Sequence, residues 1–238
     1  MKLSIIIPVY NEEKTVKSLL KAVNKVKFIG VEKEIIIIDD GSIDTSAFQI
    51  SNLKSQISNF KFIRHKKNLG KGAAVRTGIK EATGDYLVIQ DADLEYNPQE
   101  IKKLIAPVLQ AKAEVVYGTR LKRLPNFKRD EKALQPLLHY LGNKLLSLIT
   151  SILYAQWITD METCYKLFPK KALVGFQLRS RGFEFEPEIT AKLLKKKYKI
   201  IEVPITTKPR NYKEGKKLYA FKDGPKALWA LIKYRFID

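Results

Sequence analysis

The first 120 residues alternate short, continuous apolar runs with longer segments of helical periodicity. The apolar runs are rich in isoleucine and valine, which is typical of parallel strands covered on both faces. They predict strands at residues 3–9, 34–39, 61–65, 86–90 and 114–118. The segments between them predict helices at residues 12–26, 45–58, 72–82 and 98–111. This alternation of strand and helix predicts an α/β fold, a Rossmann-like doubly wound and mainly parallel sheet.

The pattern changes after about residue 120. Between Ala133 and Thr159 the only full charge is Lys144. Apolar residues recur there at helical spacing: Leu134, Leu138, Leu141, Leu145, Leu148 and Ile152. This predicts a long amphipathic helix or a helix pair. The uncharged part, residues 145–159, is shorter than the roughly 20 residues that cross a bilayer, so we do not predict a transmembrane helix.

Two interpretations of this helical segment stay open. The leucines can pack on the core of the domain, or they can dip into the interface of a membrane. Basic residues favour the membrane interpretation, since cations next to an apolar helix attract anionic lipid. They precede the segment: Arg120, Lys122, Arg123, Lys128, Arg129 and Lys132.

The remaining chain predicts a strand at 162–168, a helix at 187–197 and a strand at 200–206. The tail, residues 219–236, interleaves aromatic residues with lysines and arginine, which suits either a membrane surface or a helix that closes the core. No linker or low-complexity tract divides the chain. We therefore expect one domain with C-terminal amphipathic helices.

Charge is distributed very unevenly along the chain. The net charge is +19; residues up to Thr119 carry 18 basic and 14 acidic side chains, and the rest carry 26 and 11. An excess of +15 in the second half indicates a polyanionic partner such as nucleic acid, anionic lipid or a phosphorylated substrate. A solvated basic surface of the kind found in thermophilic proteins is the alternative.

Cysteine and histidine are too few for a disulfide framework or a zinc site. The chain has one cysteine, Cys164, and two histidines, His65 and His139. The first apolar run is too short for a signal peptide. We therefore expect a reducing, cytoplasmic compartment.

Polar residues follow four of the predicted strands. They lie at residues 8–12, 39–42, 91–95 and 118–120. In an open parallel sheet, ligands bind outside the carboxyl ends of the strands, so these residues should converge on one edge. Carboxylates gathered there repel one another and need a compensating cation. Such a cluster is therefore hard to explain by folding alone.

Asp91-Ala92-Asp93 offers hard oxygen ligands at a strand end. Mg²⁺ and Mn²⁺ use one or two such carboxylates and take their other ligands from substrate phosphates and water. The pattern therefore favours a metal–diphosphate site, although an acidic turn that caps a helix has the same sequence. Gly70 and Gly72 open a helix and either expose amides to a phosphate or form an ordinary tight turn. They do not complete a dinucleotide-binding fingerprint.

Together these motifs resemble those of the family 2 glycosyltransferases, which have the GT-A fold. The motifs that carry the resemblance are Pro8-Val9-Tyr10-Asn11-Glu12, Asp39-Asp40-Gly41-Ser42, residues 68–72, Gly84-Asp85 and Asp91-Ala92-Asp93. Later motifs look like the dolichyl-phosphate mannose or glucose synthase branch: residues 118–120, 159–166, 185–188 and 210–217. The resemblance covers nearly the whole chain.

The resemblance implies roles for particular residues. It implies that the nucleotide sugar is bound by Pro8, Tyr10, Glu12, Asp39, Asp40, Lys71, Asp91 and Asp93. Asp93 would hold Mg²⁺ or Mn²⁺, and Glu95 would be a second metal ligand or part of the following turn. Phosphates of donor or acceptor would meet Arg120, Arg210 and Lys217. Asp93, Arg120 and Asp160 are the candidate catalytic residues, and Asp160 or Glu162 would orient the sugar or act as a base.

The resulting hypothesis is an inverting, metal-dependent transferase, with inversion implied by the family. It would move a hexose from a nucleotide sugar of the GDP-mannose or UDP-glucose type to a polyprenyl or dolichyl phosphate. Residues 1–120 would bind the nucleotide sugar, and residues 121–238 would form the acceptor-binding and membrane-surface half of the same domain. Attachment to the cytoplasmic face of the membrane would be peripheral, on an anionic surface, or supplied by a membrane-embedded protein partner.

Three alternatives compete with this hypothesis, and one of them is a non-catalytic sensor of nucleotide sugars. The same fold can act on a soluble or polysaccharide hydroxyl. A basic nucleic-acid-binding module would explain the charge of +19. It gives no reason for acidic residues at the strand ends, where they would repel phosphates, so we expect no nucleic-acid partner.

Overall fold

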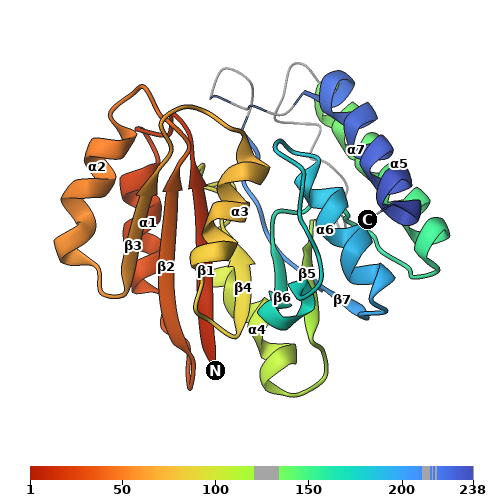
Figure 1. Ribbon diagram of the computed structural model, residues 1–238, viewed down its shortest axis with the longest axis horizontal. Coiled ribbons are helices and arrows are strands. Elements are labelled where there is room, and N and C mark those ends of the chain that lie inside the picture. The colour runs from red at the N-terminus through yellow and green to blue at the C-terminus, as the bar shows by residue number, and fades with distance from the viewer. Residues whose placement is uncertain (121–133, 211–214, 216, 218, 238) are drawn as a thin grey trace.

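A seven-stranded, mostly parallel sheet runs through the middle of the molecule (Figure 1). The computed structural model describes residues 1–120, 134–210, 215, 217 and 219–237. The strands are β1 (Lys2–Val9), β2 (Glu32–Asp39), β3 (Phe60–Arg64), β4 (Tyr86–Ile89), β5 (Val115–Thr119), β6 (Lys166–Pro169) and β7 (Ile200–Pro204). Their order in the sheet is β3-β2-β1-β4-β6-β5-β7, and only β6 is antiparallel to its neighbours. The predicted sheet is confirmed.

Helices cover both faces of this sheet (Figure 1). They are α1 (Val16–Lys25), α2 (Ser46–Leu53), α3 (Lys71–Glu81), α4 (Ile101–Leu109), α5 (Leu134–Tyr154), α6 (Phe185–Lys195) and α7 (Ala220–Phe236). In Figure 1, α3 and α6 lie in front of the sheet and α1 lies behind it, while α5 and α7 pack side by side at one end. Strands β1 and β4 are almost wholly buried between these layers, as are residues 35–39 of β2, which explains their isoleucine and valine runs.

The strand predicted at 162–168 was placed too early, since β6 begins at Lys166. Backbone N–H groups before it bond to side chains instead of a neighbouring strand. Met161 donates to Ser147 Oγ at 3.0 Å, and Cys164 donates to the Tyr96 hydroxyl at 3.1 Å. The predicted strand at 200–206 ends earlier, at Pro204. The helix predicted from residue 12 begins at Val16 because the carbonyl of Glu12 closes a turn with Thr15 and Val16.

The long helix predicted between residues 133 and 159 is confirmed as α5, but its orientation differs from the core-facing interpretation. Leu141, Leu145, Leu148 and Ile152 all point to solvent. The side chains of Leu134 and Leu138, and the basic residues Lys122, Arg123, Lys128, Arg129 and Lys132, lie outside the described residues. None of the described helices is both long enough and apolar enough to cross a membrane.

Candidate functional site

The carboxyl ends of β1, β2, β4 and β5 meet at one edge of the sheet, as predicted. Pro8 helps to open this edge. The ladder between β1 and β4 ends with Gln90 N donating to Ile6 O at 2.9 Å, and the next donor on β1 would be residue 8. Proline has no N–H, so the pairing stops there and the chain after β4 can diverge.

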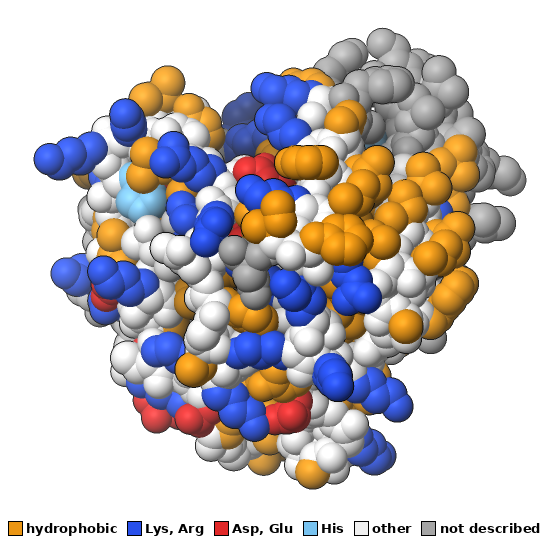
Figure 2. All heavy atoms as spheres, turned by 45° about the vertical axis from the view of Figure 1, so that its right-hand side comes forward, with side chains coloured by type: hydrophobic (Ala, Val, Ile, Leu, Met, Phe, Trp, Pro, Cys, Tyr) orange, Lys and Arg blue, Asp and Glu red, His pale blue; other side chains and the backbone are white. Residues whose placement is uncertain are grey.

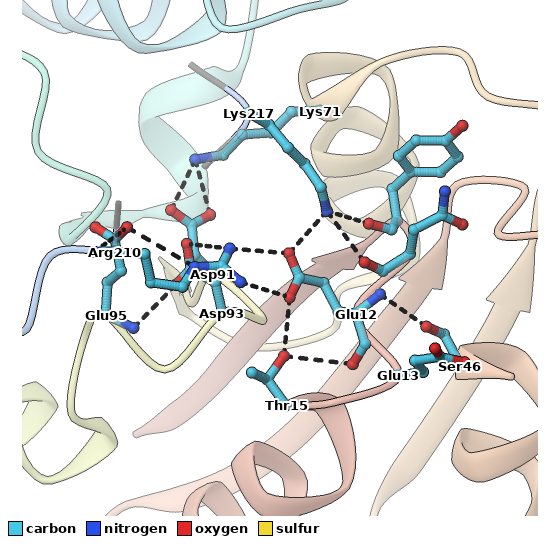
Figure 3. A network of polar contacts seen from close by, with 12 residues as sticks. Glu12, Glu13, Thr15, Ser46, Lys71, Asp91, Asp93, Glu95, Arg210 and Lys217 are labelled. Carbon is cyan, nitrogen blue, oxygen red and sulfur yellow. Dashed lines mark hydrogen bonds and ion pairs between the residues drawn. The ribbon is translucent and has the colours of Figure 1, made fainter. Parts of the chain in front are cut away.

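A segment from the C-terminal half crosses this edge. We call residues 205–210 the crossing segment. It pairs with the turn after β4 through a bridge between Tyr96 and Thr207, and Lys208 N donates to Glu95 O at 2.9 Å. The crossing segment places Arg210, and Lys217 beyond it, over acidic residues from the first half of the chain (Figure 3).

Glu12 is enclosed by cations. Arg210 donates from its two terminal nitrogens to both carboxylate oxygens, at 3.0 and 3.1 Å, and Lys217 Nζ lies 2.7 Å from Oε1 (Figure 3). Thr15 Oγ1 donates to Oε2 at 2.9 Å. Burial opposes ionisation of this carboxyl, but the hydrogen bonds from Arg210 and Lys217 prevail and lower the pKa of Glu12. Lys217 also donates to the carbonyl of Tyr10 and lies over its ring, 5.6 Å from the centroid.

Asp93 and Glu95 share the same arginine. Arg210 Nη2 lies 3.2 Å from Asp93 Oδ2, and the backbone N–H of Arg210 donates to Glu95 Oε1 at 3.0 Å. Burial, together with the charges of Asp91 and Glu95, raises the pKa of Asp93 to about 7. A further cation close to Asp93 would stabilise the ionised carboxylate and lower its pKa.

Asp91 belongs to a second series of ion pairs. The sequence pointed to Asp91 and Lys71 but not to their connection with Glu186 and Lys166. Lys71 Nζ lies 2.7 Å from Asp91 Oδ1 and 3.3 Å from Glu186 Oε1, and Lys166 Nζ lies 2.6 Å from Glu186 Oε2. Burial opposes the charge of Lys71, but Asp91 and Glu186 raise its pKa well above the ordinary value. Lys166 and Glu186 were not predicted to act together, because their pairing depends on β6 and α6 meeting in the fold.

The start of α3 positions Lys71. Gly70 has φ +97°, and a Cβ there would lie 2.3 Å from the carbonyl oxygen of Arg181. Only glycine fits this backbone conformation and this close approach. The glycine therefore serves the packing of α3 against the segment before α6, and it sets Lys71 beside Asp91.

Asp39 and Asp40 are fixed by neighbouring groups. Asp40 accepts hydrogen bonds from Leu69 N at 3.0 Å and Gly70 N at 2.7 Å, and His65 Nδ1 lies 2.7 Å from its Oδ1. Asp39 accepts from Ser42 N at 3.0 Å and pairs with Arg64 at 2.9 Å. Both carboxylates hold the loops that surround the edge.

Arg120 and Asp160 form a bidentate pair. Arg120 Nε and Nη2 reach the two oxygens of Asp160 at 2.8 and 2.7 Å, its backbone N–H donates at 2.8 Å, and Asn143 Nδ2 donates at 2.7 Å. Asp160 is fully buried; burial opposes ionisation, but Arg120 and Asn143 lower its pKa. A carboxylate committed to four donors is poorly suited to accept a proton from a substrate, so the geometry gives Asp160 the role of holding Arg120.

Glu162 differs from Asp160, since one of its buried carboxylate oxygens has no hydrogen-bond partner among the described residues.

Replacing Glu162 with glutamine should make the stability of the protein less sensitive to pH. Burial raises the pKa of Glu162 from 4.5 to about 7. The folded protein thus keeps this proton to higher pH than the unfolded chain, and the wild type loses up to about 3 kcal/mol of stability as pH rises through that range.

Glutamine has no proton to lose. The free energy of unfolding of Glu162→Gln relative to wild type should therefore increase between about pH 5 and pH 8. Urea unfolding of both proteins at the two pH values measures this difference. A difference that does not change with pH would contradict the raised pKa.

Among the described residues, no three Asp, Glu, His or Cys side chains are grouped as a preformed metal site. Asp93 and Glu95 nevertheless fit a divalent cation that takes further ligands from phosphate and water, because Mg²⁺ is usually held by one or two carboxylates in this way. The cation that now faces these carboxylates is Arg210.

Comparison with known proteins agrees with the fold. Residues 4–174 match the sequence profile described as glycosyl transferase family 2. The chain is 34% identical over 220 residues to a UDP-N-acetylglucosamine–dolichyl-phosphate N-acetylglucosaminyltransferase of Methanococcus voltae, covering 85% of this chain and 84% of that protein. It is 32% identical over 210 residues to a dolichol-phosphate mannosyltransferase of Pyrococcus furiosus, covering 87% of this chain but 56% of that protein.

Solved structures share the fold at low sequence identity. Glucosyl-3-phosphoglycerate synthase from Mycobacterium tuberculosis in complex with UDP superposes with a TM-score of 0.75 at 16% identity, covering 100% of this chain and 81% of that one. The same enzyme with Mn²⁺, UDP and phosphoglyceric acid gives a TM-score of 0.72 at 18% identity, covering 100% and 79%. The sheet and helices described above are therefore the GT-A arrangement.

Proposed function

The chain belongs to glycosyl transferase family 2, in the branch that contains the dolichyl-phosphate sugar transferases, and from that premise we propose that it transfers a sugar from a nucleotide sugar to a polyprenyl phosphate. The proposed reaction inverts the anomeric centre. The acceptor phosphate attacks the sugar carbon, and the bond from that carbon to the nucleoside diphosphate breaks. Relatives named for N-acetylglucosamine and mannose both match the chain, so the donor class includes N-acetylhexosamines as well as the hexoses expected from the sequence.

The donor side of the proposal rests on the acidic edge. Pro8, Tyr10 and Glu12 at the end of β1, with Asp39 and Asp40 shaping the loops, would bind the nucleoside. Asp91, paired with Lys71, would bind the ribose or the sugar. Residues 1–120 would thus form the donor-binding half, and residues 121–238 the half that binds acceptor.

The metal side rests on Asp93 and Glu95, which would hold Mg²⁺ or Mn²⁺. A bound divalent cation neutralises negative charge that develops on a departing diphosphate. For these carboxylates to reach the cation, Arg210 has to leave its present position beside Asp93. Arg210 could then contact donor or acceptor phosphate beside Lys217, which is the role that we assign to these two residues.

The pair of Arg120 and Asp160 is the observation that favours a phosphate acceptor over a sugar hydroxyl. A sugar hydroxyl must lose a proton when it attacks, whereas a phosphate monoester is already an anion near neutral pH. Asp160 is occupied by Arg120 and Asn143, so this part of the site presents a cation where a hydroxyl acceptor would need a base. A guanidinium recognises a phosphate.

We place the reaction at the cytoplasmic face of a membrane, where a lipid phosphate meets a water-soluble nucleotide sugar. Attachment would be peripheral, with or without a membrane-embedded partner protein. The relatives named for dolichyl phosphate support a lipid phosphate as the acceptor, and the cytoplasmic face is part of our proposal.

A donor screen tests the function. The purified protein is incubated with polyprenyl phosphate, Mn²⁺ or Mg²⁺, and each labelled UDP- or GDP-sugar in turn, and lipid-extractable label is counted. We expect one donor to give product with the phosphate and none to give product with unphosphorylated polyprenol. Transfer to a soluble hydroxyl acceptor, without transfer to the lipid phosphate, would contradict the proposal.

A further inference from the structure

Helix α5 turns an apolar stripe toward solvent. Leu141, Leu145, Leu148 and Ile152 lie four, three and four residues apart, so they share one side of the helix, and they are 46–72% exposed. Trp157, just beyond the helix, is 73% exposed. Isolated apolar residues on a protein surface are ordinary, but a contiguous stripe marks a surface that something else covers.

The side of α5 that faces the protein carries several polar residues beside Leu146, which is buried in the hydrophobic core. Asn143 donates to Asp160 at 2.7 Å, and Ser147 Oγ accepts from Met161 N at 3.0 Å. Ser151 Oγ accepts from Ile158 N at 3.0 Å, and Thr150 is fully buried. The helix thus buries mainly polar side chains and leaves the stripe of four apolar residues exposed, whereas an ordinary surface helix buries its apolar side.

Helix α7 continues this apolar surface. It packs beside α5, and Tyr154 at the end of α5 donates to Leu231 O at 2.9 Å. Trp229, Ile232 and Phe236 of α7 are exposed. Figure 2 shows hydrophobic side chains gathered on the part of the surface that α5 and α7 form. We call the outward sides of these two helices the α5–α7 face.

Positive charge borders the α5–α7 face. A pocket of about 390 Å³ beside α7 is lined by Arg179, Arg181, Lys226 and Lys233, with Trp229 at its wall and Glu184 as its only acidic residue. No acidic residue occurs in the sequence from Leu134 to Ile158. Apolar and tryptophan side chains next to a cluster of cations match the two layers of an anionic bilayer surface, acyl chains and headgroup phosphates.

We propose that the α5–α7 face docks on an anionic lipid bilayer, with the stripe of α5 among the acyl chains and the basic pocket beside α7 on lipid headgroups. This inference rests on the proposed function, because a lipid phosphate acceptor is the reason to expect contact with a bilayer. The docked helix is directly connected to the candidate site, since Asn143 on the inner side of α5 bonds to Asp160, which holds Arg120. Helix α5, roughly 10–12 Å across with its side chains, therefore lies between the docked surface and the pair of Asp160 and Arg120.

Vesicle binding tests the inference without donor or acceptor, so its failure is distinct from a failure of sugar transfer. Wild-type protein is sedimented with vesicles of phosphatidylcholine, with and without phosphatidylglycerol, at low and high salt. We expect binding to the anionic vesicles that weakens with salt but does not vanish, because the apolar contacts are not screened. Equal binding to both kinds of vesicle, or none to either, would overturn the proposal.

A charge-matched pair of variants locates the contact. Leu145→Glu with Ile152→Glu places two negative charges on the stripe, and Ile29→Glu with Phe48→Glu places two at exposed apolar positions elsewhere. The stripe variant should lose at least about tenfold in vesicle binding. The control has the same net charge, but its new charges lie away from the α5–α7 face, so it should lose much less. Equal losses would contradict the α5–α7 face as the site of contact.

The two tryptophans give a readout in the unaltered chain. Trp157 and Trp229 are its only tryptophans, and both are exposed on or beside this face. Their emission should shift to the blue on anionic vesicles and should be quenched by brominated acyl chains. Unshifted emission from protein that co-sediments with the vesicles would overturn the proposal. A second outcome would also overturn it: a wild type that is dimeric by sedimentation equilibrium and a stripe variant that is monomeric, since the stripe would then join two copies of the chain.

Discussion

Replacing Asp93 with asparagine should reduce sugar transfer at least about a thousandfold, equivalent to about 4 kcal/mol of transition-state stabilisation. Asparagine keeps the shape of the side chain but removes the charge that would hold a divalent cation beside the diphosphate. Binding of UDP or GDP should also lose its dependence on Mn²⁺, which titration calorimetry measures with and without the metal. This second readout separates loss of the metal from loss of the fold.

Asp85→Asn is the matched control for this variant. Asp85 lies before β4, at the opposite end of that strand from Asp93, and accepts a hydrogen bond from Lys2 N at 2.8 Å. It should keep the wild-type rate. An Asp93→Asn protein that retained both its rate and its response to Mn²⁺ would show that Asp93 is a turn residue.

The second large effect is expected at Arg120. Replacement with alanine should lower the rate of transfer to polyprenyl phosphate by about 10²- to 10³-fold, because it removes a donor aimed at phosphate charge. It should also lower the free energy of unfolding by about 3–5 kcal/mol, since Asp160 would remain buried without its partner. Initial rates at saturating donor and urea unfolding measure the two effects.

A double variant separates these two effects. Arg120→Met combined with Asp160→Asn removes both charges, and Asn143 can still bond to the new amide. Stability should largely return, since replacing both members of a buried ion pair is often close to neutral. Activity should stay low. If activity returned together with stability, Arg120 would be structural, and the argument for a phosphate acceptor would fail.

The strands and the acidic edge were predictable because they depend on local patterns. An isoleucine run predicts a buried strand, and residues after parallel strands share an edge whatever their distance in sequence. Lys166 shows the limit of this approach. It lies fully buried in β6, where its charge is compensated by Glu186, and a lysine in a sequence read alone is taken as exposed.

Helix α5 shows a second limit. Its leucine spacing predicted the helix and the stripe, but periodicity does not say which side of a helix faces the protein. The polar residues between the leucines, Asn143, Ser147 and Ser151, were the available signal. Their hydrogen-bond partners near residue 160 became visible only in the folded structure.

The contacts of Glu12 also bear on how the protein is made. Its partners Arg210 and Lys217 follow it by 198 and 205 residues. At roughly 5 to 20 residues per second, a ribosome needs about 10 to 40 s to add that length of chain. During this interval Glu12 lacks these two countercharges, so its carboxylate must stay hydrated or take up a proton. The carboxylate that follows β1 thus gains these two countercharges only after the sheet and most of the helices have been synthesised.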